Sequence, residues 1–188
     1  MILHCMGQPR KTLLTTSRNP TPMMRTFCHD LARVMSNVVY VNRGKMNNDD
    51  VAEKAIEHDA DRVMINDRGQ SGLGVLRLFR VGESGLTEAS PKLHFAARLH
   101  KEFGVSNVKP AAVINVEATN RSDELARLAA SLSGFLGLPV SPEEQEHKSA
   151  LTAMSISRGE PGRIVVTFMA EPGHIEVGPR ITVSRLEW

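Results

Sequence analysis

The chain of 188 residues has few aromatic residues, few cysteines and no long apolar run. Aromatic side chains account for 4% of the residues, so the core must be built mainly from Leu, Ile, Val, Ala and Met. No apolar stretch approaches the roughly 20 residues of a membrane span, and the N-terminal residues show no apolar leader. Cys5 and Cys28 have no metal-binding spacing, which favours reduced thiols. We therefore expect a soluble, cytoplasmic protein.

Motifs that would support catalysis or cofactor binding are also missing. No Gly-Lys-Ser/Thr phosphate loop occurs, and GQSGLG at residues 69–74 has the wrong glycine spacing for a dinucleotide loop. The seven histidines show no ligand spacing with cysteines or acids. The acidic run of Glu143, Glu144 and Glu146 is typical of a solvated turn. We therefore expect no cofactor, no metal ion and no enzymatic activity.

Positive charge is concentrated in the first quarter of the sequence. Residues 1–48 hold seven Lys and Arg side chains against one acid, Asp30, for a net charge of +6. The remaining 140 residues hold 16 basic and 20 acidic side chains, for a net charge of −4. This asymmetry indicates a positive surface that would attract a polyanion such as a nucleic acid. The alternative interpretation is that these cations are simply solvated.

The hydrophobic pattern alternates apolar strands with amphipathic helices. In the N-terminal part it predicts strand, helix, strand, helix and strand at residues 11–16, 22–35, 37–41, 49–58 and 62–66. Strands are expected next at 75–81 and from 85 to about 99, then a strand and a helix at 111–116 and 123–135. Three further strands are expected at 150–156, 163–169 and 180–186. This order is typical of an α/β protein with a mixed, partly parallel sheet and packed helices.

Two segments of the chain share one arrangement. Near residues 13 and 113, an apolar strand is followed by a polar turn that carries an arginine and then by an amphipathic helix. Few residues are identical between the two segments. The pattern is compatible with two related halves, but any α/β protein repeats strand, turn and helix.

The first helix carries the most informative basic side chains. Arg25, His29 and Arg33 are four residues apart, so they form one stripe away from the apolar face of the helix. Arg18 stands in the turn just before this helix, where the helix N-terminus favours anions. Guanidinium groups match the oxygens of a phosphate with two parallel hydrogen bonds. The stripe therefore predicts binding to the phosphate backbone of RNA. The alternative is that these arginines form ion pairs with a neighbouring acid.

The segment from Thr15 to Leu31, TTSRNPTPMMRTFCHDL, resembles the opening signature of Brix-domain proteins, which runs roughly T-S-R-x-P-S-x-R-x-R-x-F-x-K-E-L. Its matches are Thr16, Ser17, Arg18, Pro20, Arg25, Phe27 and Leu31, with Thr21 and Asp30 in place of Ser and Glu. Met23 and His29 depart from the basic residues of the pattern. Further matches follow in order at VNRG (41–44), NDRG (66–69) and VGPR (177–180). The chain is most similar to the archaeal single-domain form.

The resemblance implies one Brix domain over residues 1–188. It also implies two pseudo-symmetric halves, about 1–100 and 101–188, each like the anticodon-binding domain of class II aminoacyl-tRNA synthetases. The implied function is non-enzymatic work in ribosome biogenesis, with precursor ribosomal RNA and ribosomal or other assembly proteins as partners and no membrane. Alternatives are a scaffold that recruits ribosomal proteins and, less favoured, an RNA-modifying enzyme. The candidate RNA ligands are Lys11, Arg18, Arg25, Arg33, Arg43, Lys45, Arg68 and Arg180.

Overall fold

The computed structural model describes residues 11–70, 74–106, 108–116, 122–142, 152–171 and 173–188. Its first part runs β1 (Thr12–Thr16), α1 (Pro22–Val34), β2 (Val38–Tyr40), α2 (Asn48–Glu57), β3 (Arg62–Arg68), β4 (Gly74–Gly82) and β5 (Gly85–Arg98). A short 3-10 helix, η2 (His100–Glu102), follows. The remainder is β6 (Ala111–Val116), α3 (Asp123–Leu136), β7 (Val140–Pro142), β8 (Thr152–Arg158), β9 (Ile164–Ala170), β10 (Ile175–Glu176) and β11 (Arg180–Glu187).

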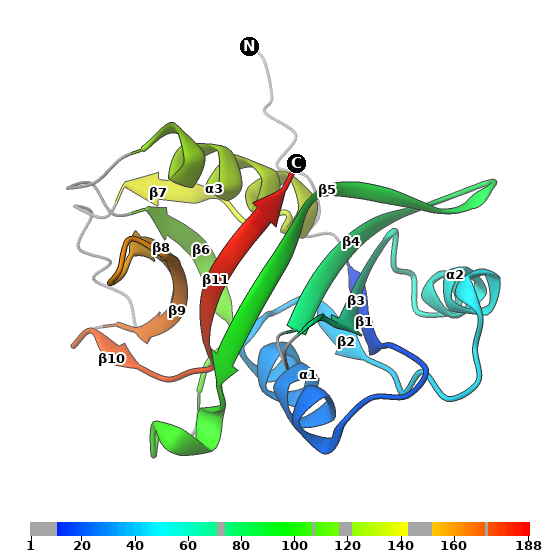
Figure 1. Ribbon diagram of the computed structural model, residues 1–188, viewed down its shortest axis with the longest axis horizontal. Helices are drawn as coiled ribbons and strands as arrows, with labels where there is room; N and C mark the ends of the chain where they lie inside the picture. The colour runs from blue at the N-terminus through cyan, green and yellow to red at the C-terminus, as the bar shows by residue number, and fades with distance from the viewer. Residues whose placement is uncertain (1–10, 71–73, 107, 117–121, 143–151, 172) are drawn as a thin grey trace, which may run out of the picture.

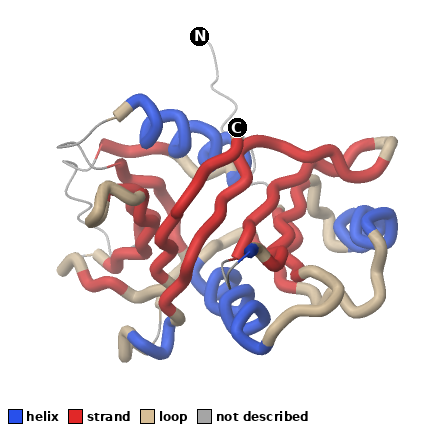
Figure 2. Tube along the Cα trace, viewed as in Figure 1, coloured by secondary structure: helices blue, strands red, loops and turns tan. Residues whose placement is uncertain are grey.

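All strands belong to one mixed sheet, which confirms the α/β prediction. The order is β2-β1-β3-β4-β5-β11-β9-β8-β6-β7, with β10 attached to β9. β1 pairs in parallel with β2 and β3, whereas β4 and β5 continue the sheet as antiparallel strands. Figures 1 and 2 show β5 and β11 side by side in the middle of the sheet. Among the described residues, no helix is long and apolar enough to cross a membrane.

The strand order is the same from both ends of the sheet. β1, β2, β3, β4 and β5 correspond in position to β6, β7, β8, β9 and β11. Register agrees as well, because Thr16 pairs with Asn66 on β3 as Val116 pairs with Ile156 on β8. This topological symmetry is what two related halves would produce. The division at residues 1–100 and 101–188 and the likeness of each half to an anticodon-binding domain stay predictions.

The core lies mainly on the face of the sheet that α1 and α3 cover. Leu14 and Met64 of the sheet join Leu31 of α1 and Leu128 of α3 in one continuous apolar cluster. Successive strand residues point to opposite faces, and Leu13 accordingly belongs to a smaller cluster formed with α2. The two faces therefore have separate cores, and the larger one spans both ends of the sheet.

Local sequence explains where the helices begin and end. The hydroxyl of Thr21 accepts a hydrogen bond from the Met24 amide at 3.3 Å, which caps α1 as expected. α2 begins one residue before the predicted acids, because Asn47 and Asp50 form a reciprocal capping box. α3 continues through Gly134 and ends at Gly137, whose φ of 71° favours glycine.

Candidate nucleic-acid interface

The parallel strands β1, β2 and β3 end at the same edge of the sheet, and basic residues follow each of them. The Ser17 amide donates to the Asn66 carbonyl at 3.0 Å, which holds the ends of β1 and β3 together. Arg18 lies beyond β1, Lys45 lies in the loop after β2, and Arg68 is the last residue of β3. In open α/β sheets, ligands bind outside the carboxyl ends of the strands. The predicted RNA ligands Arg18, Lys45 and Arg68 therefore meet at one edge.

The N-terminus of α1 lies beside this edge and adds Arg25 from its first turn. We call Arg18, Arg25, Lys45 and Arg68 the basic edge. All four side chains are exposed, and none forms an ion pair within the part of the chain that the structure describes. The positive end of the α1 dipole reinforces their field. This edge can therefore accept phosphate groups without first breaking an internal salt bridge.

The rest of the basic stripe runs along the exposed face of α1. His29 and Arg33 are exposed, while Leu31 is 2% exposed, so the predicted separation of the two faces is confirmed. The His29 ring packs edge-on against Tyr40 of β2, with 4.3 Å between ring centroids. Asp30, the nearby acid, accepts a hydrogen bond from the His100 amide at 2.8 Å. Arg33 forms no ion pair with any described residue, and it lies roughly 12 Å along the helix from Arg25.

Arg43 differs from the expectation of an exposed phosphate ligand. The residue is 6% exposed, and its guanidinium donates from Nε to the Met46 carbonyl and from Nη2 to Asn48 Oδ1, both at 2.8 Å. Burial, followed by the positive field of Arg18, lowers the pKa of Arg43. Two of its donors thus tie the loop after β2 to the start of α2, whereas the buried Nη1 has no hydrogen-bond partner in the described structure.

Lys11 and Arg180 lie apart from the other candidates and have acidic partners. Lys11 precedes β1, at the opposite end of that strand from Arg18, and its Nζ lies 3.3 Å from Asp59 Oδ2. Arg180 binds the Glu176 carboxylate with two nitrogens, and the Nε–Oε1 distance is 2.8 Å. Hydrogen bonding to Glu176 raises the pKa of Arg180. A phosphate would have to compete with Glu176 for this guanidinium.

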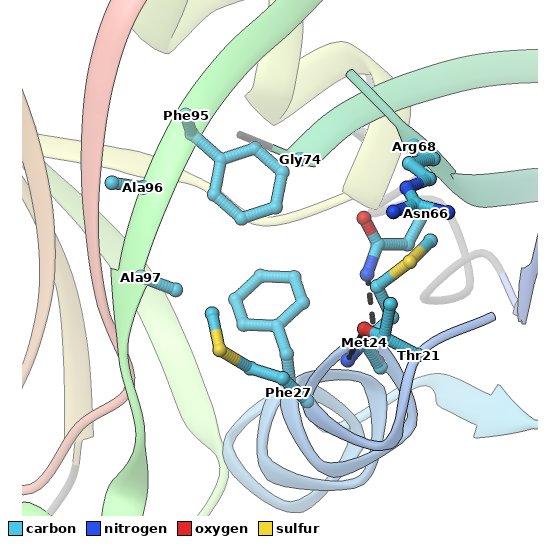
Figure 3. Close-up of a pocket in the computed structure, with 10 residues that line it drawn as sticks. Thr21, Met24, Phe27, Asn66, Arg68, Gly74, Phe95, Ala96 and Ala97 are labelled. Carbon is cyan, nitrogen blue, oxygen red and sulfur yellow. Dashed lines mark hydrogen bonds between the residues drawn. The ribbon is translucent and has the colours of Figure 1, made fainter. Parts of the chain in front are cut away.

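A pocket of ≈ 160 Å³ opens next to the basic edge, and no sequence pattern had indicated it. Figure 3 shows its walls, to which α1 contributes Phe27, β3 contributes Asn66 and β5 contributes Phe95. Arg68 stands at its rim. The full lining is Thr21, Met23, Met24, Phe27, Asn66, Arg68, Gly74, Phe95, Ala96 and Ala97. Only Arg68 of this set was predicted as a ligand, because the others come from segments whose pairing the sequence pattern does not specify.

Asn66 is the unusual member of the pocket. It is 1% exposed, and its Nδ2 contacts the Met24 carbonyl at 3.5 Å and Cys28 Sγ at 3.6 Å. Its Oδ1 is buried and has no hydrogen-bond partner in the described structure. Cys28 itself is inert, because burial raises the pKa of its thiol to about 12. Residues 71–73 of the GQSGLG segment and the acidic run at 143–146 lie outside the described residues.

The fold and this edge define an α/β protein with two matching strand-helix units and an exposed cationic face. No family model matches the sequence. The structure is similar to the crystal structure of a probable ribosomal biogenesis protein from Aeropyrum pernix, with a TM-score of 0.76 at 19% identity. That alignment covers 95% of this chain and 99% of the other, and it establishes the likeness of fold.

Curated relatives agree with the motifs in the sequence. Three archaeal proteins named "probable Brix domain-containing ribosomal biogenesis protein" match parts of the chain. The Aeropyrum pernix protein is 31% identical over 68 residues, 36% of this chain and 38% of its own length. The Thermococcus kodakarensis protein is 28% identical over 98 residues, which are 52% of this chain and 47% of its own length. The Pyrococcus horikoshii protein is 40% identical over 53 residues, which are 28% of this chain and 24% of its own length. The matches thus span a quarter to about half of each relative, and this part of the chain is similar to archaeal Brix-domain proteins.

Proposed function

We propose that this protein is a ribosome biogenesis factor that binds precursor ribosomal RNA and acts by binding rather than by catalysis. The names of its curated relatives support the ribosomal part of the proposal. The basic edge supports the RNA part. Its partners would be ribosomal RNA and the ribosomal or assembly proteins that gather on it, with no membrane involved.

The observation that carries the proposal is the convergence of Arg18, Arg25 and Arg68 where the parallel strands end. Exposed arginines commonly pair with acids on protein surfaces, but these three have no such partner among the described residues. Each guanidinium is therefore free to bind a phosphate bidentately. Phosphate contacts of this kind hold a nucleic acid in place without reading its sequence.

A role in binding rather than catalysis is supported by the chemistry next to the edge. Cys28 Sγ contacts Asn66 Nδ2 at 3.6 Å, and burial raises the pKa of this thiol to about 12, so it is not activated as a thiolate. The basic side chains of the edge are suited to holding phosphates. An RNA-modifying enzyme would need an activated nucleophile or a bound cofactor in this region.

The direct test is RNA binding at several salt concentrations. Fragments of the precursor ribosomal RNA should bind with an affinity that falls steeply as salt rises, because phosphate binding releases counterions. Arg18→Ala combined with Arg68→Ala should weaken binding and flatten the salt dependence by about one to two units of slope. Arg68→Ala alone is compared with Arg158→Ala as its matched control, because Arg158 occupies the position of Arg68 in the other half of the sheet and pairs with Glu124 at 2.8 Å. Equal behaviour of wild type and the double variant would contradict the proposal.

A protein-interaction scaffold is the second candidate, and the two ends of the sheet favour it. Edge strands β2 and β7 each expose a valine, Val39 at 39% and Val140 at 43%. Unpaired edge strands can bind an extended segment of another protein. Apolar docking of this kind depends weakly on salt. Binding of a ribosomal protein that resists high salt, together with no RNA binding, would support the scaffold instead.

A further inference from the structure

We propose that the pocket beside the basic edge holds one unpaired pyrimidine base of the bound RNA. This inference rests on the proposed RNA-binding function and specifies what that RNA must offer. It requires a single-stranded nucleotide whose phosphate lies at Arg68 and whose base enters between α1 and β5. The pocket and the buried Asn66 amide are the two observations behind it.

The side-chain oxygen of Asn66 is a hydrogen-bond acceptor that lacks a donor in the described structure. A buried polar atom without a hydrogen bond is unfavourable, and such atoms in folded proteins usually have an explanation. Figure 3 shows the amide nitrogen of Asn66 directed to Met24, with the oxygen on the side of the two phenyl rings. Because this oxygen is buried beside the Phe95 ring, an N–H group entering the pocket would satisfy it once that ring moves aside.

The matching position in the other half of the sheet contains no such pocket-forming set among the described residues. Arg68 pairs with Gly74 across β3 and β4 as Arg158 pairs with Ile164 across β8 and β9. By the same registers, Asn66 corresponds to Ile156 and Phe95 corresponds to Val183.

The replacements close the second site with aliphatic side chains. Ile156, Ile164 and Val183 are at most 5% exposed and belong to the main core. In the first half, Gly74 leaves room that Phe95 takes, since a Cβ there would lie 2.7 Å from the Phe95 ring. The pocket is therefore not a by-product of the topology, because the same topology packs solidly when the residues are apolar.

The size and lining of the pocket select a single aromatic ring. An apolar cavity of roughly 150 Å³ accommodates benzene, and this pocket measures ≈ 160 Å³. Phe27 and Phe95, with ring centroids 4.8 Å apart, provide aromatic contact for a base. Cytosine and uracil each combine one ring with an N–H donor on the edge used for base pairing, the exocyclic amine of cytosine or N3–H of uracil. The second ring of a purine would extend out of a pocket of this volume and lose contact with its walls.

Short single-stranded RNAs of equal charge test the inference. Octamers of uridine, cytidine and adenosine are compared with an abasic ribose-phosphate octamer for affinity to the full chain. The pyrimidine octamers should bind about tenfold more tightly than the abasic one, and more tightly than the adenosine octamer. Asn66→Ile, which copies Ile156, should abolish this preference and leave the salt slope unchanged. Asn115→Leu is the matched control, since Asn115 is also a buried asparagine with an unpartnered Oδ1 but lies outside the pocket.

A second measurement on the wild-type protein decides the matter if Asn66→Ile does not fold. Met23 and Met24 line the pocket, so the NMR signals of their methyl groups should shift when the uridine octamer is added and stay in place with the abasic octamer. Equal affinity for all four octamers with a steep salt slope would overturn the base pocket and leave RNA binding intact. No binding of any octamer or of longer ribosomal RNA would overturn both.

Discussion

Asn66 and Ile156 occupy equivalent positions in the sheet, yet one presents an unpartnered amide oxygen and the other completes an aliphatic core. Their parallel partners, Thr16 and Val116, end the first strand of each unit. A shared backbone thus supports two different uses. In the first half, Arg68 lies beside a pocket and has no acidic partner among the described residues. In the second half, the corresponding Arg158 pairs with Glu124.

The first prediction concerns the basic stripe on α1. Arg25→Ala combined with Arg33→Ala should flatten the slope of log affinity against log salt by about one to two units, at roughly 0.7–0.9 per lost phosphate contact. The fold should persist, because both side chains are exposed and face away from Leu31. Titrations of precursor ribosomal RNA at several salt concentrations measure the slope.

A charge-matched control separates local contact from net charge. Arg98 and Arg185 are exposed and already lie near Glu102 and Glu187, respectively. Replacing both with alanine removes the same charge and should change the slope by less. An unchanged slope and affinity in the α1 variant would exclude the stripe as an RNA contact.

The second prediction concerns stability. Phe27 is 2% exposed and packs on Phe95, so Phe27→Ala should reduce the free energy of unfolding by about 3–5 kcal/mol. Met23 lies on the same helix but is 53% exposed, and Met23→Ala should cost less than about 0.5 kcal/mol. Chemical denaturation measures both. A loss below about 1 kcal/mol for Phe27→Ala would contradict its placement in the core.

The third prediction follows from the raised pKa of Cys28. In the unfolded chain the thiol has its ordinary pKa of 9.0, whereas burial in the folded protein raises this pKa to about 12. The protonated thiol therefore favours the folded state fully below about pH 9, and this contribution is lost as pH rises from about 9 to 12. Each pH unit in that window should cost at most about 1.4 kcal/mol from this group.

Comparison with Cys28→Ala isolates the thiol from other groups that titrate at high pH. The difference between the unfolding free energies of wild type and variant should stay constant up to about pH 9 and shrink above it. Tyr40 also titrates at high pH, because burial and then the charge of the Cys28 thiolate raise its pKa, so both proteins carry Tyr40→Phe to remove this coupled group. A difference that stays flat to about pH 11 would mean that Cys28 is solvated.

Local signals account for most of the fold that the sequence predicted. The periodicity of Met24, Phe27 and Leu31 with the Thr21 cap placed α1, and apolar runs placed the longer strands. β7 and β10, of three and two residues, were not predicted, because they lack the apolar run NVVYV at residues 37–41 that indicated the similarly short β2. They exist because neighbouring strands offer hydrogen-bonding partners, which depends on tertiary structure.

Helix spacing made the exposure of some candidate ligands predictable. Arg25 and Arg33 have that property, whereas Arg43 is buried where Met46 of the loop and Asn48 of α2 accept its hydrogen bonds. The pocket needs Asn66, Gly74 and Phe95 to align across β3, β4 and β5, and register between strands is not encoded in any one segment. From the sequence, Arg68 was therefore predicted only as one of several cationic RNA ligands, and the pocket beside it was not predicted.

The last prediction ranks Arg180 below Arg25 as an RNA contact. Arg180 follows the Gly178-Pro179 entry to β11, and its guanidinium is occupied by Glu176, whose carboxylate accepts from two of its nitrogens. A phosphate would have to displace this carboxylate, whereas Arg25 has no acid to release among the described residues. At matched low salt, Arg180→Ala should therefore weaken RNA binding less than Arg25→Ala does. Glu176→Gln provides the complementary variant, because freeing Arg180 should strengthen binding slightly if RNA passes near β11. If Arg180→Ala were the more damaging change, the main RNA contact would lie at the centre of the sheet and not at the basic edge.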